Sequence, residues 1–269
     1  MLAVAKLLLY GGTALVIGVA ALQRWRVFAV AGTTPAALRA TLGGSWFAIG
    51  MALLAMLVLQ VRELEVDSLG GLQALLAATT WGHGFAVLFA CAMLGTFAWM
   101  LRWREETTAI FSVALAFALG GLGHAAADES WPVVSRVVDG LHVFGVGAWI
   151  GGLFLLARFA PHEHQRDAWA AFSRRATLLA PLVLLSGVVS SLLRLRASSL
   201  AANLESDYGR LLLLKTALVL VVVGFGVRHR RHLAQRTLPA SASVKMELAF
   251  AALVLAATSL LTGTSPTGM

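Results

Sequence analysis

The sequence predicts an all-α, polytopic membrane protein with eight transmembrane helices and both termini on the outer side of the membrane. Hydrophobic residues make up 59% of the 269 residues, and only 13% are charged. A soluble chain would carry roughly 25% charged residues. The mean hydropathy is +0.81. One water-soluble core has no room for this much apolar surface, whereas a bilayer accepts it on the outside of the helices.

The individual spans follow from the length of the apolar segments, because about 20 mostly apolar residues cross a bilayer. Eight segments meet this condition: Val4–Leu22, Thr41–Val61, His83–Leu101, Thr107–His124, Val137–Ala157, Ala176–Leu193, Leu211–Val227 and Met246–Thr262. The first is expected to be retained, since its stronger positive cluster follows the apolar run, whereas a cleaved signal carries its charge before the run. We therefore expect a single transmembrane domain over residues 1–269, without a separate soluble domain.

The distribution of charge predicts the orientation. The net charge is +8, and it is interpreted here by location, because cytoplasmic connections are rich in Lys and Arg. Fourteen of the 21 cationic residues fall on one predicted side: Arg24, Arg26, Arg39, Arg102, Arg104, Arg158, Arg166, Arg174, Arg175, Arg228, Arg230, Arg231, Arg236 and Lys245. Eight acidic residues fall on the other: Glu63, Glu65, Asp67, Asp128, Glu129, Asp139, Glu205 and Asp207. The basic side is cytoplasmic, so both termini face outward.

This orientation divides the seven histidines into two groups. His83, His124 and His142 fall at the outer ends of the third, fourth and fifth spans. Asp139 precedes His142 by three residues, which places both on one helix face. Ionisable residues at membrane depth indicate function, and imidazole with a nearby carboxylate suits copper, zinc or iron. The sequence therefore favours an outer metal site formed by His83, His124, His142 and Asp139.

Each of these residues also has a structural interpretation. His83 and His124 lie near the interface, where a histidine can simply cap a helix, and Lys215 is an alternative partner for Asp139. The pair His229 and His232 lies among arginines and is interpreted as part of a solvated basic cluster.

Sulfur-containing residues and glycines are interpreted mainly as packing residues. Among the candidate copper(I) ligands, Cys91 and Met93 do not share a helix face with His83, and Met51 and Met56 are five residues apart, which places them on different faces of their span. We therefore expect all four to fill the core. The fifth span carries a small-x-x-x-small pair that predicts close helix packing, Gly147 and Gly151. A second stripe on that span joins His142, Gly145, Trp149 and Gly152.

In several segments the sequence resembles the copper resistance protein D (CopD) family. The resemblance rests on Asp139-Gly140-Leu141-His142, Gly147–Leu153, Asp207–Lys215, Arg228-His229-Arg230-Arg231, Gly123-His124-Ala125 and Gly263–Pro266. It covers nearly the whole chain and is strongest over residues 124–269. At Trp81-Gly82-His83 the chain departs from the family's aromatic-Gly-Arg pattern.

The resemblance implies a multi-pass protein of the bacterial inner membrane that binds copper, as Cu(I) or Cu(II), at the periplasmic side and transports it toward the cytoplasm. It also implies a periplasmic copper-binding partner of the CopC kind. No enzymatic activity, catalytic residue or nucleic-acid partner is expected. Two alternatives remain: a haem-b-binding redox protein, with two histidines on facing helices, and a non-transporting copper sensor or assembly factor.

Overall fold

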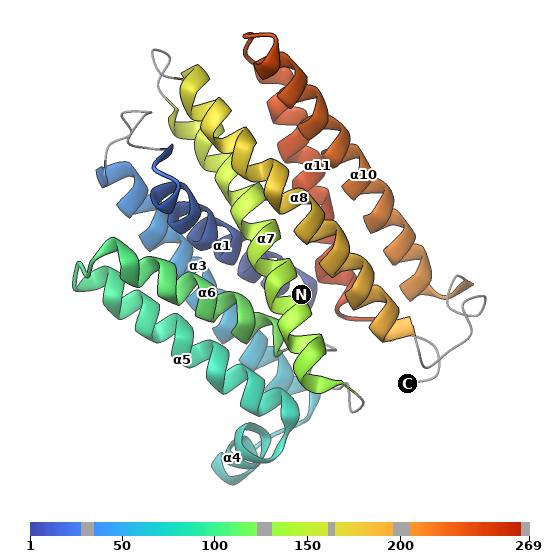
Figure 1. The fold of residues 1–269 in the computed structure, drawn as a ribbon. Coiled ribbons are helices and arrows are strands. Elements are labelled where there is room, and N and C mark those ends of the chain that lie inside the picture. The colour runs from blue at the N-terminus through green and yellow to red at the C-terminus, as the bar shows by residue number, and fades with distance from the viewer. Residues whose placement is uncertain (28–34, 123–130, 161–164, 196–204, 265–269) are drawn as a thin grey trace.

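The computed structural model describes residues 1–27, 35–122, 131–160, 165–195 and 205–264, and these residues form helices without a β-strand. The helices are α1 (Leu2–Arg24), α3 (Pro35–Glu63), α4 (Leu69–Ala78), α5 (Thr80–Met100), α6 (Glu105–Gly120), α7 (Pro132–Phe159), α8 (Gln165–Leu195), α10 (Asp207–Ala234) and α11 (Ser241–Leu261). Apart from α4, consecutive helices run in alternating directions (Figure 1). The predicted all-α fold is confirmed for this part of the chain.

Seven helices of the described chain are long and apolar enough to cross a membrane, and they correspond to seven of the predicted spans. The remaining predicted span, Thr107–His124, overlaps α6, which has 16 residues and packs between α5 and α7. Its predicted end, His124, lies outside the described residues. The chain is therefore a multi-pass membrane protein.

Local signals define where several helices begin and end. Ser68, Thr79 and Ser206 each accept a hydrogen bond from the backbone N–H three residues later, which satisfies a free donor at the starts of α4, α5 and α10. Pro132 opens α7, where its missing N–H costs nothing. The helix α4 was not predicted; its ten residues are too short to cross a bilayer and they lie at the end opposite the basic connections (Figure 1).

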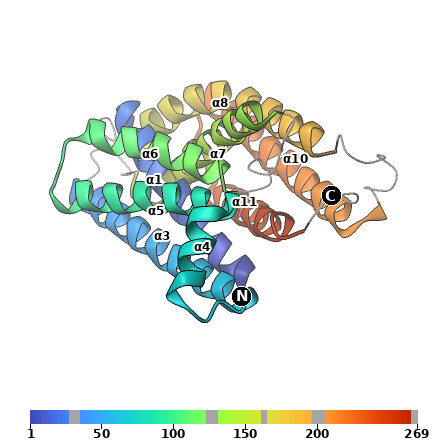
Figure 2. The same ribbon diagram turned by 90° about the horizontal axis from the view of Figure 1, so that it is seen from below.

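The helix α1 is the central element, and it packs against α3, α6, α7 and α11 (Figure 2). The predicted close packing through small residues is confirmed where α1 crosses α7. A Cβ atom on Gly151 would collide with the backbone oxygen of Ala14, and one on Gly147 would lie 2.8 Å from Ile17. The backbones of α1 and α7 are thus in direct contact, which only glycine permits.

The other predicted stripe of α7 faces a different neighbour. A Cβ on Gly145 would lie 2.8 Å from Val183, and one on Gly152 would lie 2.7 Å from Phe172, both on α8. The side chain of Trp149 reaches Gly226 of α10. One face of α7 therefore packs on α1, while the face that carries His142 points toward α8 and α10.

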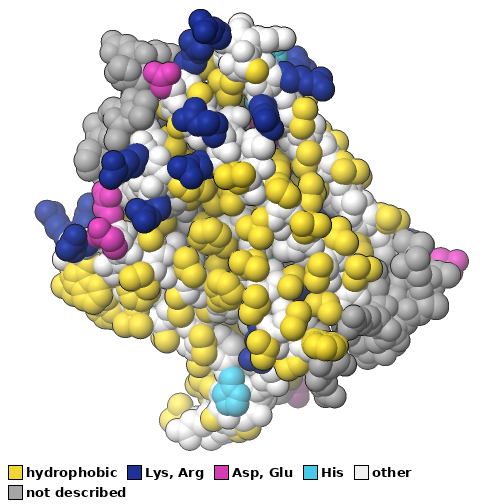
Figure 3. Space-filling model, in the orientation of Figure 1, with side chains coloured by type: hydrophobic (Ala, Val, Ile, Leu, Met, Phe, Trp, Pro, Cys, Tyr) yellow, Lys and Arg dark blue, Asp and Glu magenta, His cyan; other side chains and the backbone are white. Residues whose placement is uncertain are grey.

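The surface separates charge from apolar area. Lys and Arg side chains gather toward one end of the face in Figure 3, and hydrophobic side chains cover much of the remainder. Large apolar side chains such as Leu220 (62% exposed) and Leu185 (66% exposed) point outward from α10 and α8. This surface suits a hydrocarbon environment rather than water.

Candidate functional site

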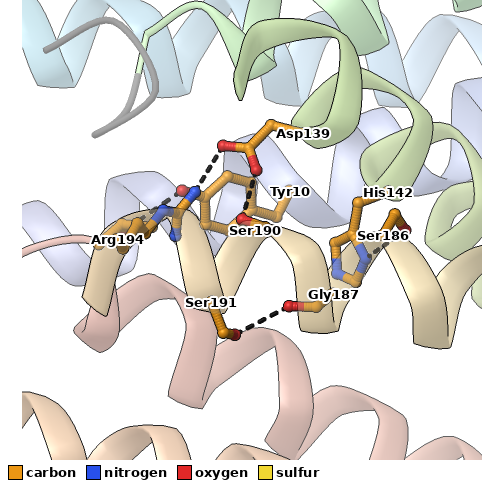
Figure 4. A network of polar contacts seen from close by, with 9 residues as sticks. Tyr10, Asp139, His142, Ser186, Gly187, Ser190, Ser191 and Arg194 are labelled. Carbon is orange, nitrogen blue, oxygen red and sulfur yellow. Dashed lines mark hydrogen bonds and ion pairs between the residues drawn. The ribbon is translucent and has the colours of Figure 1, made fainter. Parts of the chain in front are cut away.

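The site begins with Asp139 on the N-terminal half of α7, whose carboxylate contacts side chains of α8. Ser190 donates a hydrogen bond to Oδ1 over 2.6 Å, and Arg194 forms an ion pair with Oδ2 (Figure 4). Because Ser190 and Arg194 are four residues apart, they share one face of α8. The side chains of Asp139 and Arg194 are only 14% and 20% exposed. Two helices are therefore joined here by a charged contact at membrane depth.

One turn further along α7, His142 points at the same face of α8. Its Nδ1 lies 3.1 Å from the backbone oxygen of Val183 and 3.1 Å from the hydroxyl of Ser186. A carbonyl oxygen only accepts hydrogen bonds, so the contact with Val183 favours the tautomer that carries its proton on Nδ1. The other nitrogen, Nε2, then keeps its lone pair and has no hydrogen-bond partner among the described residues.

The close approach of His142 to α8 depends on a glycine. A Cβ atom on Gly187 would lie 3.1 Å from Cε1 of the imidazole, which is tighter than an ordinary contact. Gly187 therefore leaves the space that the ring occupies (Figure 4).

Asp139 and His142 both line a cavity of about 890 Å³ that lies between α1, α7, α8, α10 and α11 and is also lined by residues of α3, α5 and α6. Much of its lining is aliphatic, but it also contains three cationic side chains: Lys6, Arg194 and Lys215. Lys6 donates a hydrogen bond to the backbone oxygen of Thr262 over 2.8 Å, and the Tyr10 hydroxyl lies 3.2 Å from the Thr262 hydroxyl. These contacts tie the start of α1 to the end of α11 beside the cavity.

The structure brings two of the four predicted site residues together. Asp139 and His142 share a face and a cavity, as their spacing predicts. His83 lies elsewhere: its side chain is exposed, it is not part of the cavity lining, and its Nε2 is 2.8 Å from the backbone oxygen of Ala77 in α4. His124 lies outside the described residues. Within the described ranges, no group of three or more His, Cys, Asp or Glu side chains is arranged to hold a metal ion.

The partner of Asp139 was not predicted. Lys215 was the alternative from sequence, but Arg194 forms the ion pair. The sequence contained an indication of this ion pair. Ser190 and Arg194 lie at the predicted outer end of the sixth span, where an arginine needs an anionic partner. Among the sulfur residues, Met56 is buried and lines the cavity, whereas Met51 (48%) and Met93 (39%) are exposed on the apolar surface. These two do not fill the core as expected.

The prediction for His229 was wrong. Instead of lying in a solvated basic cluster, it is 5% exposed, near the C-terminal end of α10. Its Nδ1 is 2.8 Å from Oε2 of Glu247 on α11, and its Nε2 is 2.9 Å from the Ser243 hydroxyl. The ring centroid of Trp169 on α8 lies 6.2 Å away. Glu247 could have shown this, because it falls within the last predicted span and a buried acid requires a partner.

The fold and the cavity together define a multi-pass helical membrane protein with a polar site enclosed by its helices. Residues 166–262, which cover α8, α10 and α11 almost completely, match the family model described as Copper resistance protein D, CopD. The match supports a copper resistance protein of the CopD family, as the sequence resemblance predicts. That family consists of copper resistance membrane proteins and is not a known enzyme family. No curated protein and no solved structure matches the chain.

Proposed function

We propose that this protein binds copper in the cavity between α7, α8 and α10, with Nε2 of His142 as a ligand, and passes it toward the cytoplasm. The observation that carries the proposal is the contact between Nδ1 of His142 and the backbone oxygen of Val183. Histidines that bind metals usually donate the proton of their other ring nitrogen to a carbonyl or carboxylate, which fixes the ring and leaves the ligating lone pair free. His142 meets this condition beside a cavity large enough to admit an ion and its ligands.

Asp139 acts in this proposal through its position beside His142. Its oxygens are engaged by Ser190 and Arg194, so direct binding to copper requires Arg194 to release one of them. If Arg194 stays in place, Asp139 is a positioning residue that joins α7 to α8 and keeps His142 in register with Val183. His124 and His83 complete the proposed ligand set; His83 would have to leave its contact with Ala77. Met56 adds a thioether to the same cavity, and thioethers suit Cu(I).

The topology proposed with this site has eight spans, a single membrane domain and both termini on the periplasmic side of the bacterial inner membrane. The alternating helix directions support it, because α6 must cross between α5 and α7 for the chain to continue. The end that carries Arg24, Arg104 and Arg158 is then cytoplasmic, and the Asp139 end is periplasmic. A periplasmic copper-binding protein of the CopC kind is the proposed donor.

Copper analysis of two histidine variants tests the site. We expect purified His142→Ala to lose most of its bound copper, while His232→Ala, near the opposite end of the same protein, keeps it. Equal copper content in the two variants would refute the assignment to His142. A Soret absorption band in the purified protein would instead support the haem-binding alternative.

Copper uptake into liposomes tests transport separately. Vesicles that contain the wild-type protein should accumulate copper above the level of empty vesicles, and vesicles with His142→Ala should not. Wild-type vesicles that bind copper without accumulating it would leave a sensor or assembly factor as the function. A pH jump or an imposed membrane potential identifies the driving force, since the sequence contains no G-x-x-x-x-G-K-S/T nucleotide-binding loop.

A further inference from the structure

The cavity is much larger than a copper site requires, and its lining contains more cationic than anionic side chains. Its volume of about 890 Å³ is typical of pockets that enclose an organic ligand, which range from roughly 300 to 1,000 Å³. Three cationic side chains line it, Lys6, Arg194 and Lys215, against two carboxylates, those of Asp139 and Glu63. Asp139 is already paired with Arg194 and also interacts with Lys215, so one carboxylate faces two cationic groups.

Lys215 is the residue whose charge is unbalanced. It lies eight residues after the start of α10, which places it about 12 Å along the helix axis. It is close enough to Arg194, Asp139 and His142 for their charges to interact, yet its ammonium group has no hydrogen-bond partner among the described residues. An ammonium group in apolar surroundings without an anion is costly. The site is therefore incomplete without a negatively charged group.

The remaining lining indicates what carries that negative charge. Val146, Val219, Val254 and Leu255 form an aliphatic wall deeper in the cavity. Four other lining residues of α8 and α10 are also exposed on the apolar outer surface: Leu184, Val188, Leu192 and Leu213. The cavity thus opens between α8 and α10 toward the hydrocarbon region, where a ligand with an alkyl chain can enter.

We propose that the cavity binds an acidic amphiphile of the membrane, with its anionic head group on Lys215 and its acyl chain along the aliphatic wall. The head group is a phosphate or a carboxylate, supplied by an acidic phospholipid or by a free fatty acid. Lys6 lies at the same cavity and adds a second cationic group near the outer surface. This proposal does not depend on copper. A bound anion would, however, offset the charge of Lys215 near His142 and so favour copper, and the coupling would act in both directions.

The experiment measures lipid retained by the purified full-length protein, by native mass spectrometry in nanodiscs of equal phosphatidylglycerol and phosphatidylcholine, and by oleate titration in neutral detergent. We expect wild-type protein to retain phosphatidylglycerol or oleate and Lys215→Met to bind the same ligand at least about tenfold more weakly, since one charge-assisted hydrogen bond is lost. Whichever of the two ligands shows this dependence identifies the source of the head group.

Two variants separate this effect from misfolding. Lys215→Arg keeps the charge and should restore binding, and Lys245→Met makes the same chemical change at an exposed position on α11 and should leave binding unchanged. Three results would each overturn the proposal. The protein could retain phosphatidylcholine as well as phosphatidylglycerol, bind oleyl alcohol as tightly as oleate, or keep its affinity in the Lys215→Met variant. Copper content measured on the same samples keeps the two proposals apart: Lys215→Met should lose the amphiphile and still bind copper, and His142→Ala should do the reverse.

Discussion

Two histidines of the described helices, His142 and His229, differ in what surrounds them. His142 uses one ring nitrogen, its Nε2 has no hydrogen-bond partner in the part of the chain that the structure describes, and it lines a cavity of about 890 Å³. In His229, Nδ1 lies 2.8 Å from a carboxylate oxygen of Glu247 and Nε2 lies 2.9 Å from the Ser243 hydroxyl, and the ring contacts Trp169 and Phe225 outside that cavity. The same side chain is therefore available to a ligand in one place and fully engaged in the other. An unsatisfied nitrogen beside open space, rather than the presence of a histidine in a membrane-spanning helix, therefore distinguishes the candidate binding site.

The largest effect is expected at the closed site. Replacing Glu247 by Ala leaves His229 buried without its partner, and breaking a buried pair in this way costs about 3–5 kcal/mol. Thermal unfolding in detergent should show a strongly lowered Tm, while the copper bound per folded molecule stays constant. Glu247→Gln keeps the shape and a hydrogen bond and should be much milder. A loss of copper at unchanged Tm would mean that His229 belongs to the metal path, and the comparison would fail.

A smaller loss of stability is expected at the open site. The contact of Asp139 with Arg194 is partly exposed, so Asp139→Asn should cost about 1–3 kcal/mol. In a double-mutant cycle with Arg194→Gln, the two changes should be non-additive by about 0.5–3 kcal/mol, because the residues are in direct contact. Additive effects would show that the ion pair does not join α7 to α8 in the membrane.

Gly187 tests whether the position of His142 determines copper affinity. Gly187→Ala places a methyl group 3.1 Å from the imidazole and should displace the ring from Val183. We expect copper affinity to fall by about tenfold, as is usual when a contact that orients a ligand is lost, with little change in Tm. Gly224→Ala on α10 is the control, because no atom lies within 4 Å of the added methyl. Equal affinities in the two variants would contradict this role for Gly187.

The smallest effects come from the two serines that contact the histidines. Ser243→Ala removes the partner of Nε2 in His229 and should cost about 0.5–1.5 kcal/mol of stability without changing copper affinity. Ser186→Ala should do the opposite, weakening copper binding at nearly constant stability, because Val183 still accepts the proton of His142. Isothermal titration with copper and thermal unfolding of both variants provide the test. If both variants changed copper affinity and stability in the same way, the proposed difference between the two sites would be wrong.

The sequence predicted the apolar part of each membrane-spanning helix, because hydrophobicity determines that part, but it did not predict where the helix ends. The predicted span Ala176–Leu193 belongs to α8, which begins eleven residues earlier, at Gln165. Likewise, α10 continues to Ala234, beyond the predicted end at Val227. In both cases the helix extends beyond the apolar segment through arginines, which favour a helix but are too polar to count as membrane-spanning. The extension of α10 is what carries His229 into a packed position against α8 and α11.

The sequence by itself determined the membrane class, the distribution of charge along the chain, and the placement of Asp139 and His142 on one helix face. These depend on local composition and on helical periodicity, which any segment carries within itself. Only the tertiary structure decided that Arg194 rather than Lys215 pairs with Asp139, that His229 is buried with Glu247, and that Nε2 of His142 is left free. Each of these depends on which helix faces which across the bundle. That pairing is decided by close backbone contacts such as Gly151 against Ala14, between residues far apart in the chain.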